Sequence, residues 1–229
     1  MFANSRPSIL KIKRKVIIFG TGGHAVSAAS LAEQCGYYVS CFVSFQKTIG
    51  EVNGRQILPI ESFPSKSKIS VVIAVGDNFL RESIAGELVM LAKCKSLEIA
   101  FPNLIHPSCH IGSHAQLGQG NQLFPGANLG AYSRIEDFVV INHLSSLDHE
   151  SSMESFASLA PAAVTGGRVK IGRRAALLIN STVSNGIAIG NDAIIAANSF
   201  VKENVMDNCL VAGSPAQFIR YHRAGDSYL

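Results

Sequence analysis

From Ile105 onward, the sequence repeats with a period of six residues. Of seventeen positions spaced six apart, sixteen are aliphatic or methionine, and Thr165 is the exception. An amphipathic helix would need a period of 3.6, and an ordinary sheet would not keep a six-residue period over so many units. The repeat therefore predicts a parallel β-helix in which these positions face inward. They are Ile105, Ile111, Leu117, Leu123, Leu129, Ile135, Ile141, Leu147, Met153, Leu159, Thr165, Ile171, Leu177, Val183, Ile189, Ile195 and Val201.

A second series lies four residues after the first. Of its sixteen positions, from Cys109 to Ser199, twelve are Ala, Ser or Cys. Small side chains suit the places where the wall of a triangular solenoid turns. Because one coil cannot bury its own inner face, each coil should stack on the next.

The first hundred residues follow a different pattern, in which strands alternate with helices. That order predicts a small parallel, Rossmann-like α/β domain with its strand-to-helix loops on one edge, where ligands usually bind. We therefore expect an α/β domain over residues 1–100 and a β-helix domain with a C-terminal tail over residues 101–229. The elements predicted in the first domain are strands at 16–19, 38–43 and 69–75, and helices at 25–35 and 79–95.

Composition excludes several other classes of protein. The net charge is only +4 with no long basic stripe, so nucleic-acid binding is not expected. No run of 18 apolar residues is present, so we expect no membrane span. The five cysteines are scattered and never in a CxxC spacing, which argues against a disulfide framework or a zinc site and favours a reducing compartment. We expect a soluble cytoplasmic protein.

Four motifs point to a known family: residues 19–24 (FGTGGH), residues 74–78 (AVGDN), the pair His149-Glu150, and residues 211–216 (VAGSPA) followed by Ile219-Arg220. Together with the six-residue period, they resemble the hexapeptide-repeat acyltransferases. The match is to the branch that acetylates sugars, either on the amino group of nucleotide-linked 4-amino sugars or on a hydroxyl of sialic acids. The resemblance implies left-handed coils, acetyl-CoA as co-substrate, no metal, and a homotrimer with CoA between neighbouring β-helices.

His149 is the predicted general base. It lies two residues after the inward-facing Leu147, so it should stand on the outer wall, where imidazole can take a proton near neutral pH. The resemblance assigns Glu150 to orient the ring. Two alternatives remain open: His149 could be a solvated surface residue, or His143, two residues after the inward-facing Ile141, could be the base instead. Asn142 and His143 could also line the path of the acyl donor.

The resemblance also implies a sugar-nucleotide site on the first domain. The glycine turn suits phosphate oxygens because it exposes backbone N–H groups at the start of a helix. A purely structural turn is the alternative. Related enzymes usually carry aspartates at the end of the second strand, whereas this chain has Ser44-Phe45, which bears on whether a nucleotide binds. The predicted substrate residues are Gly22, Gly23, His24, Ser44, Asn78 and Arg81.

For acetyl-CoA, the resemblance implies a path along one groove of the β-helix. Leu178 stands where a glycine is common and should narrow that groove. Several arginines are candidates for the CoA phosphates, with a solvated surface role as the alternative. The predicted acetyl-CoA residues are Asn142, Ser158, Gly167, Ile179 and Ala197, and the arginines are Arg173, Arg174, Arg220 and Arg223.

These observations favour one function and leave two others open. The leading prediction is an acetyl-CoA-dependent N-acetyltransferase for a nucleotide-linked amino sugar, acting by direct attack of the amine with His149 as base. The second is a sialic-acid-type sugar O-acetyltransferase. The third, of another class, is a non-catalytic sugar-binding β-helix scaffold.

Overall fold

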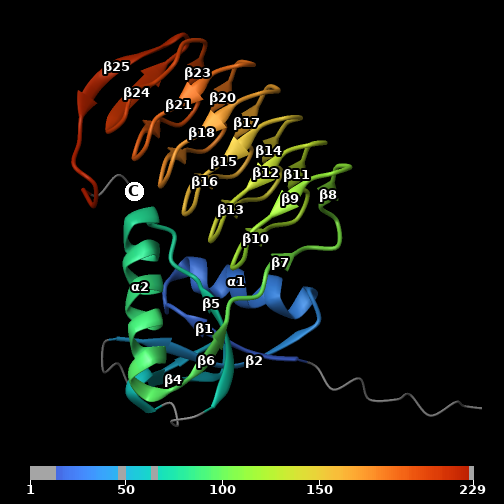
Figure 1. Ribbon diagram of the computed structural model, residues 1–229, viewed down its shortest axis with the longest axis vertical. Helices are drawn as coiled ribbons and strands as arrows, with labels where there is room; N and C mark the ends of the chain where they lie inside the picture. The colour runs from blue at the N-terminus through green and yellow to red at the C-terminus, as the bar shows by residue number, and fades with distance from the viewer. Residues whose placement is uncertain (1–13, 46–49, 63–66, 227–229) are drawn as a thin grey trace, which may run out of the picture.

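The computed structural model describes residues 14–45, 50–62 and 67–226, which form an α/β domain followed by a β-helix (Figure 1). Residues 1–13, 46–49, 63–66 and 227–229, which the predicted domain ranges include, lie outside the described residues.

The first domain is a six-stranded sheet with one helix on each face. Its strand order is β3-β4-β2-β1-β5-β6, and all its pairs are parallel except the β3–β4 pair. Helix α1 packs on one face of the sheet, and α2 packs on the other. The elements are β1 (Arg14–Phe19), α1 (Gly23–Gln34), β2 (Tyr37–Ser44), β3 (Glu51–Val52), β4 (Arg55–Pro59), a 3-10 turn (Ile60–Ser62), β5 (Lys68–Ile73), α2 (Asn78–Lys95) and β6 (Glu98–Ala100).

The predicted strands and helices of this domain are present with ends shifted by a few residues, but β3, β4 and β6 were not predicted. These three strands have two to five residues each. Strands β4 and β6 are held by pairing with β2 and β5, a long-range contact that a local pattern does not reveal, and β3 pairs antiparallel with β4.

The second domain is a left-handed β-helix. Seventeen two-residue strands end at the seventeen predicted inward positions, and each of the first fourteen pairs in parallel with the strand 18 residues further on. The strands stack into three sheets. In chain order they are β7 (Leu104–Ile105), β8 (His110–Ile111), β9 (Gln116–Leu117), β10 (Gln122–Leu123), β11 (Asn128–Leu129), β12 (Arg134–Ile135), β13 (Val140–Ile141), β14 (Ser146–Leu147), β15 (Ser152–Met153), β16 (Ser158–Leu159), β17 (Val164–Thr165), β18 (Lys170–Ile171), β19 (Ala176–Leu177), β20 (Thr182–Val183), β21 (Ala188–Ile189), β22 (Ile194–Ile195) and β23 (Phe200–Val201).

The predicted register is confirmed. Fourteen of the seventeen inward positions are buried, Thr165 included. The other three, Ile105, Ile111 and Leu117, belong to the first coil, and Ile111 is 38% exposed. A terminal coil has a neighbouring coil on one side only, which explains why its inward side chains are less covered.

The corners of the β-helix share one backbone conformation. From His114 to Asn198, every sixth residue has a positive φ, and twelve of these fifteen residues are not glycine. Glu150 is one of them, with φ of 54°. A positive φ in a tight turn is normally adopted by glycine. Because most of these corner residues are of other types, the residue types alone did not reveal this conformation.

The last coil is covered by a hairpin. Strand β24 (Cys209–Gly213) adds to β22 in parallel, and β25 (Ala216–Tyr221) returns antiparallel to β24. This hairpin lies at the end of the molecule opposite the α/β domain (Figure 1).

Candidate active site

His149 and Glu150 form one corner of the β-helix, between β14 and β15. Nδ1 of His149 lies 3.1 Å from Oε2 of Glu150, and the two side chains are 48% and 52% exposed. An ionised carboxylate can only accept, so Nδ1 carries the proton of the neutral ring. Nε2 therefore keeps its lone pair, which is the arrangement that a general base needs.

The imidazole of His149 lies against Gly167, the equivalent residue one coil later. A Cβ atom at position 167 would lie 2.4 Å from both Nε2 and Cε1 of the ring. Any side chain there would displace the imidazole. The resemblance implied Gly167 as part of the acetyl-CoA path, whereas the structure places it beneath the predicted base, where its missing Cβ makes room for the ring.

Two further residues hold this corner. Oδ1 of Asp148 accepts the backbone N–H of His149 at 2.7 Å, so Asp148 fixes the backbone while Glu150 contacts the ring. Nη1 of Arg168 lies 3.6 Å from Oε2 of Glu150 and is largely exposed. Glu150 thus faces a guanidinium as well as the imidazole.

A cavity of about 390 Å³ lies between the two domains. It brings together four of the five predicted acetyl-CoA residues with His24 of the predicted sugar site, and its other lining residues are largely apolar. Leu178 lines the same cavity, as expected from its place in the groove. The lining residues are His24, Gly76, Val140, Asn142, Ser158, Leu159, Ala160, Pro161, Leu178, Ile179 and Ala197.

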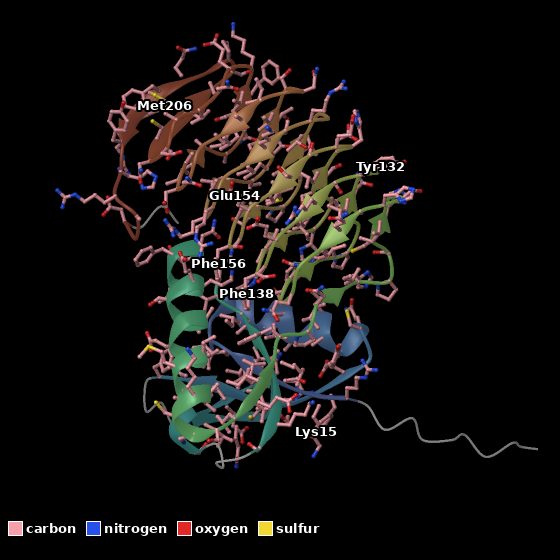
Figure 2. All side chains as sticks on the ribbon, in the orientation of Figure 1. Lys15, Tyr132, Phe138, Glu154, Phe156 and Met206 are labelled. Carbon is pink, nitrogen blue, oxygen red and sulfur yellow. The ribbon has the colours of Figure 1, made fainter. Side chains whose placement is uncertain are left out.

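His149 and this cavity lie on different corners of the β-helix. The α/β domain packs on the sheet that contains β10, β13 and β16, through residues such as Gln122, Val140 and Ser158. It also covers the two corners that flank this sheet, at Phe124 and at Phe156. His149 stands on the third corner. Tyr132, one coil before Glu150 on that corner, lies away from α2, whereas Phe138 and Phe156 lie beside it (Figure 2).

His24 is held in one tautomer. Gln122 donates from Nε2 to the carbonyl of Ile73 at 2.9 Å, so its oxygen is the atom 3.2 Å from Nε2 of His24. An amide oxygen only accepts, and Nε2 of His24 therefore carries the proton and Nδ1 is an acceptor. Burial and then the charge of Arg81 lower the pKa of His24 to about 4, against the opposing effect of the Gln122 hydrogen bond. The ring is neutral at pH 7.

Asn78 and Arg81 lie inside the junction between the domains. Arg81 is fully buried and donates to the carbonyls of Phe138 at 3.0 Å and Phe156 at 2.6 Å, and to Oδ1 of Asn78 at 2.7 Å. Asn78 donates to Oγ of Ser158 at 3.0 Å. These side chains, predicted as substrate ligands, fasten α2 to the β-helix. Their contribution to substrate binding would be to hold the cavity wall, to which Ser158 belongs.

The remaining predicted substrate residues lie at the carboxyl edge of the sheet. Gly22 is the N-cap of α1, Gly23 begins the helix, and both are exposed with open space beside them. Ser44 ends the neighbouring strand β2. The first N–H groups of a helix have no intrahelical partner, so this edge can receive an anionic group.

Arg173 and Arg174 are committed to ion pairs rather than free for phosphates. Both bond Glu82 of α2, and Arg174 also bonds Asp192 through Nη2 at 2.5 Å. Burial of Glu82 opposes its ionisation, but the hydrogen bonds from the two arginines outweigh that effect and lower its pKa. Arg220 and Arg223 are exposed in the C-terminal segment.

Sequence reasoning missed Gln122 and Phe124 as parts of the site. Gln122 is the partner of His24, 98 residues away in sequence, and Phe124 packs against both His24 and His143, with ring centroids 5.7 and 5.0 Å apart. The one available signal was that Gln122 and Phe124 flank an inward-facing leucine in β10 and so had to face the other way.

Comparison with known proteins supports the fold and the family resemblance. Residues 15–88 match the family model described as the PglD N-terminal domain. The structure of PerB from Caulobacter crescentus, in complex with CoA and GDP-perosamine, is 28% identical with a TM-score of 0.79, covering 90% of this chain and 97% of that one. The acetyltransferase domain of PglB from Neisseria gonorrhoeae is 27% identical with a TM-score of 0.81, covering 90% and 100%. The predicted resemblance is confirmed.

Among curated proteins, a putative lipopolysaccharide biosynthesis O-acetyl transferase, WbbJ from Escherichia coli, is 34% identical over 85 residues. The aligned part covers 36% of this chain and spans only 43% of that relative's length.

The described residues contain neither a candidate membrane span nor a cluster of metal ligands. Neither helix in the described ranges is long and apolar enough to cross a membrane. In the same part of the chain, no three His, Cys, Asp or Glu side chains are grouped as metal ligands.

Proposed function

We propose that this chain transfers the acetyl group of acetyl-CoA to the amino group of a nucleotide-linked amino sugar. The observation that carries the proposal is the near end-to-end structural match to a GDP-perosamine N-acetyl transferase from Caulobacter crescentus in complex with CoA and GDP-perosamine. The His149–Glu150 contact of 3.1 Å supplies the base that this chemistry requires.

In the proposed reaction, the sugar amine attacks the thioester carbonyl directly. Nε2 of His149 takes the proton that the amine loses, and Glu150 stabilises the imidazolium through Nδ1–H. The bond from the carbonyl carbon to sulfur then breaks, and CoA leaves as the thiol after taking that proton from the imidazolium. General-base catalysis of this kind contributes about 10²–10⁴-fold. Positioning of the two substrates supplies much of the remaining acceleration.

We further propose a homotrimer, in the cytoplasm, in which His149 of one subunit faces the cavity of its neighbour. The two features occupy different corners of one chain, so a neighbouring copy would bring them together. Ile179 supports this arrangement, since it lines the cavity yet remains 57% exposed. Sedimentation of a stable, fully active monomer at micromolar concentration would contradict the trimer. The cytoplasmic location rests on the scattered cysteines, which suit a reducing compartment.

A sugar O-acetyltransferase is the second candidate. Ser44 and Phe45 stand where related enzymes usually carry nucleotide-holding aspartates, and WbbJ, the curated relative, is named for O-acetyl transfer. A hydroxyl of a free sialic-acid-like sugar would then be the acceptor, with the same base. A non-catalytic sugar-binding scaffold is the third, and the oriented His149–Glu150 pair argues against it.

One assay separates the three candidates. Purified protein is incubated with acetyl-CoA and a panel of UDP-, GDP- and dTDP-linked amino sugars, alongside free sialic acids, and released thiol is measured. Thiol release with an amino sugar nucleotide, and an acetamido product by mass spectrometry, supports the first. Release only with a sialic acid supports the second, and binding without release supports the scaffold.

A further inference from the structure

A second histidine, His143, contacts the cavity residue Asn142 in a way that neither the general-base role nor the fold requires. Oδ1 of Asn142 accepts two hydrogen bonds, from the backbone N–H of His143 at 2.9 Å and from Nδ1 of His143 at 2.7 Å. A backbone N–H can only donate, so the atom that faces it must be the amide oxygen. Nδ1 of His143 consequently carries a proton.

These two bonds leave the amide nitrogen of Asn142 as the group available to a ligand. Asn142 lines the cavity, and its Nδ2 has no hydrogen-bond partner among residues 14–45, 50–62 and 67–226. The opposite orientation of the amide would place two donors against each other at His143. An amide held in this way presents N–H groups to an acceptor oxygen.

The ring of His143 is itself held in place. Its centroid lies 5.0 Å from that of Phe124, and it shares a pocket with Ser27, Ser30 and Gln34 of α1. Phe124 in turn packs against His24, another polar group of the cavity wall. The His143 ring thus lies outside the cavity lining, and its hydrogen bond towards the cavity is to Asn142.

We propose that His143 is a positioning residue that fixes the Asn142 carboxamide so that Nδ2 donates to a carbonyl oxygen of the acyl donor. This inference rests on the proposed function. The carbonyl can belong to the thioester or to the pantetheine amides, and both are acceptors of the same kind. Either way, losing the Nδ1–H contact removes one of the two hydrogen bonds that orient the amide, and a neutral hydrogen bond of this kind is worth about three- to tenfold in affinity or rate.

The test compares His143→Phe, which keeps a ring but cannot donate, with His143→Asn, whose amide can replace the Nδ1 donor. His110→Phe, at an exposed histidine of β8, is the matched control. CoA and acetyl-CoA affinities are measured by calorimetry, and kcat and KM with the accepted sugar. We expect His143→Phe to cause a three- to tenfold loss, His143→Asn to recover most of it, and the control to match the unsubstituted protein.

The ligand measurements distinguish the two carbonyls. Equal losses for CoA and acetyl-CoA indicate a pantetheine amide, and a loss confined to acetyl-CoA or to kcat indicates the thioester. A double-mutant cycle adds a second test, since His143→Phe should cost almost nothing once Asn142 is alanine. Additive effects, or no loss in His143→Phe, overturn the inference while the proposed function stands. If the unsubstituted protein neither binds CoA nor releases thiol, the proposed function fails instead.

Discussion

The corners at residues 142–145 and 148–151 belong to one coil and share one backbone turn, yet they face different surroundings. Leu144 and Glu150 hold the same positive-φ position, at 58° and 54°. The first corner lies against α1 and the cavity. Its polar side chains, Asn142 and His143, are hydrogen-bonded to each other, and Asn142 lines the cavity. The second stands in solvent and carries a half-exposed His–Glu pair. The repeat supplies identical backbones, and what each corner faces determines its chemistry.

The largest expected effect on kcat is that of His149→Ala, and it distinguishes the role of His149 from that of His143. His149→Ala should lower kcat by about 10²-fold or more, because it removes a proton acceptor used only in the transition state, while acetyl-CoA affinity barely changes. Steady-state kinetics and calorimetry would measure both. A severe loss in His143→Ala with a nearly silent His149→Ala would show that the base is on the other corner.

Acid should destabilise the protein through His24. The folded-state pKa of His24, about 4, lies below the ordinary value of 6.5, so the folded state binds fewer protons. His24 contributes about 3 kcal/mol to the free energy of unfolding above pH 6.5. This contribution declines as the pH falls towards 4. Denaturant titrations across this range would measure it. His24→Gln should flatten the pH dependence.

Gly167→Ala tests whether kcat depends on the position of the His149 imidazole. The added Cβ would fall 2.4 Å from Nε2 of His149, so we expect a loss of about 10- to 100-fold in kcat with little change in melting temperature. Gly86→Ala is the control, since a Cβ there meets nothing within 4 Å. Unchanged kcat in Gly167→Ala would mean that the ring works in another position.

Glu150→Ala should lower kcat by about tenfold, less than His149→Ala, because the proton acceptor remains while its orienting carboxylate is lost. Glu150→Gln keeps an acceptor oxygen for Nδ1–H and should retain more activity than alanine. A Glu150→Ala loss as large as that of His149→Ala would indicate that the carboxylate does more than orient the ring.

The smallest effect should come from Arg168→Ala. Its contact with Glu150 is 3.6 Å and largely exposed, and such ion pairs contribute little. We expect a change in kcat of no more than about threefold, shrinking further in 0.5 M salt as screening increases. A tenfold loss would place Arg168 in contact with substrate.

The β-helix could be predicted almost residue by residue because every strand contributes one interior side chain, and that side chain recurs every six residues. Four cavity residues were predicted as acetyl-CoA residues from the family resemblance instead, and two of them, Ile179 and Ala197, fall on one corner one coil apart. The roles of Asn78 and Arg81 were not predictable, because their partners lie 57 to 97 residues away on the other domain. The position of Gly167 beneath His149 likewise depends on stacking between coils rather than on local pattern.

The 18-residue coil also works as a ruler. Each coil advances the chain along the solenoid axis by one strand spacing, about 4.8 Å. The number of coils before the His149 corner therefore sets, in whole steps, the height of the base along that axis. Inserting or deleting one coil before this corner would move the base by a single step relative to the α/β domain and leave every remaining turn unaltered. The number of coils is thus a way to adjust the position of the base without changing the structure of a coil or of the α/β domain.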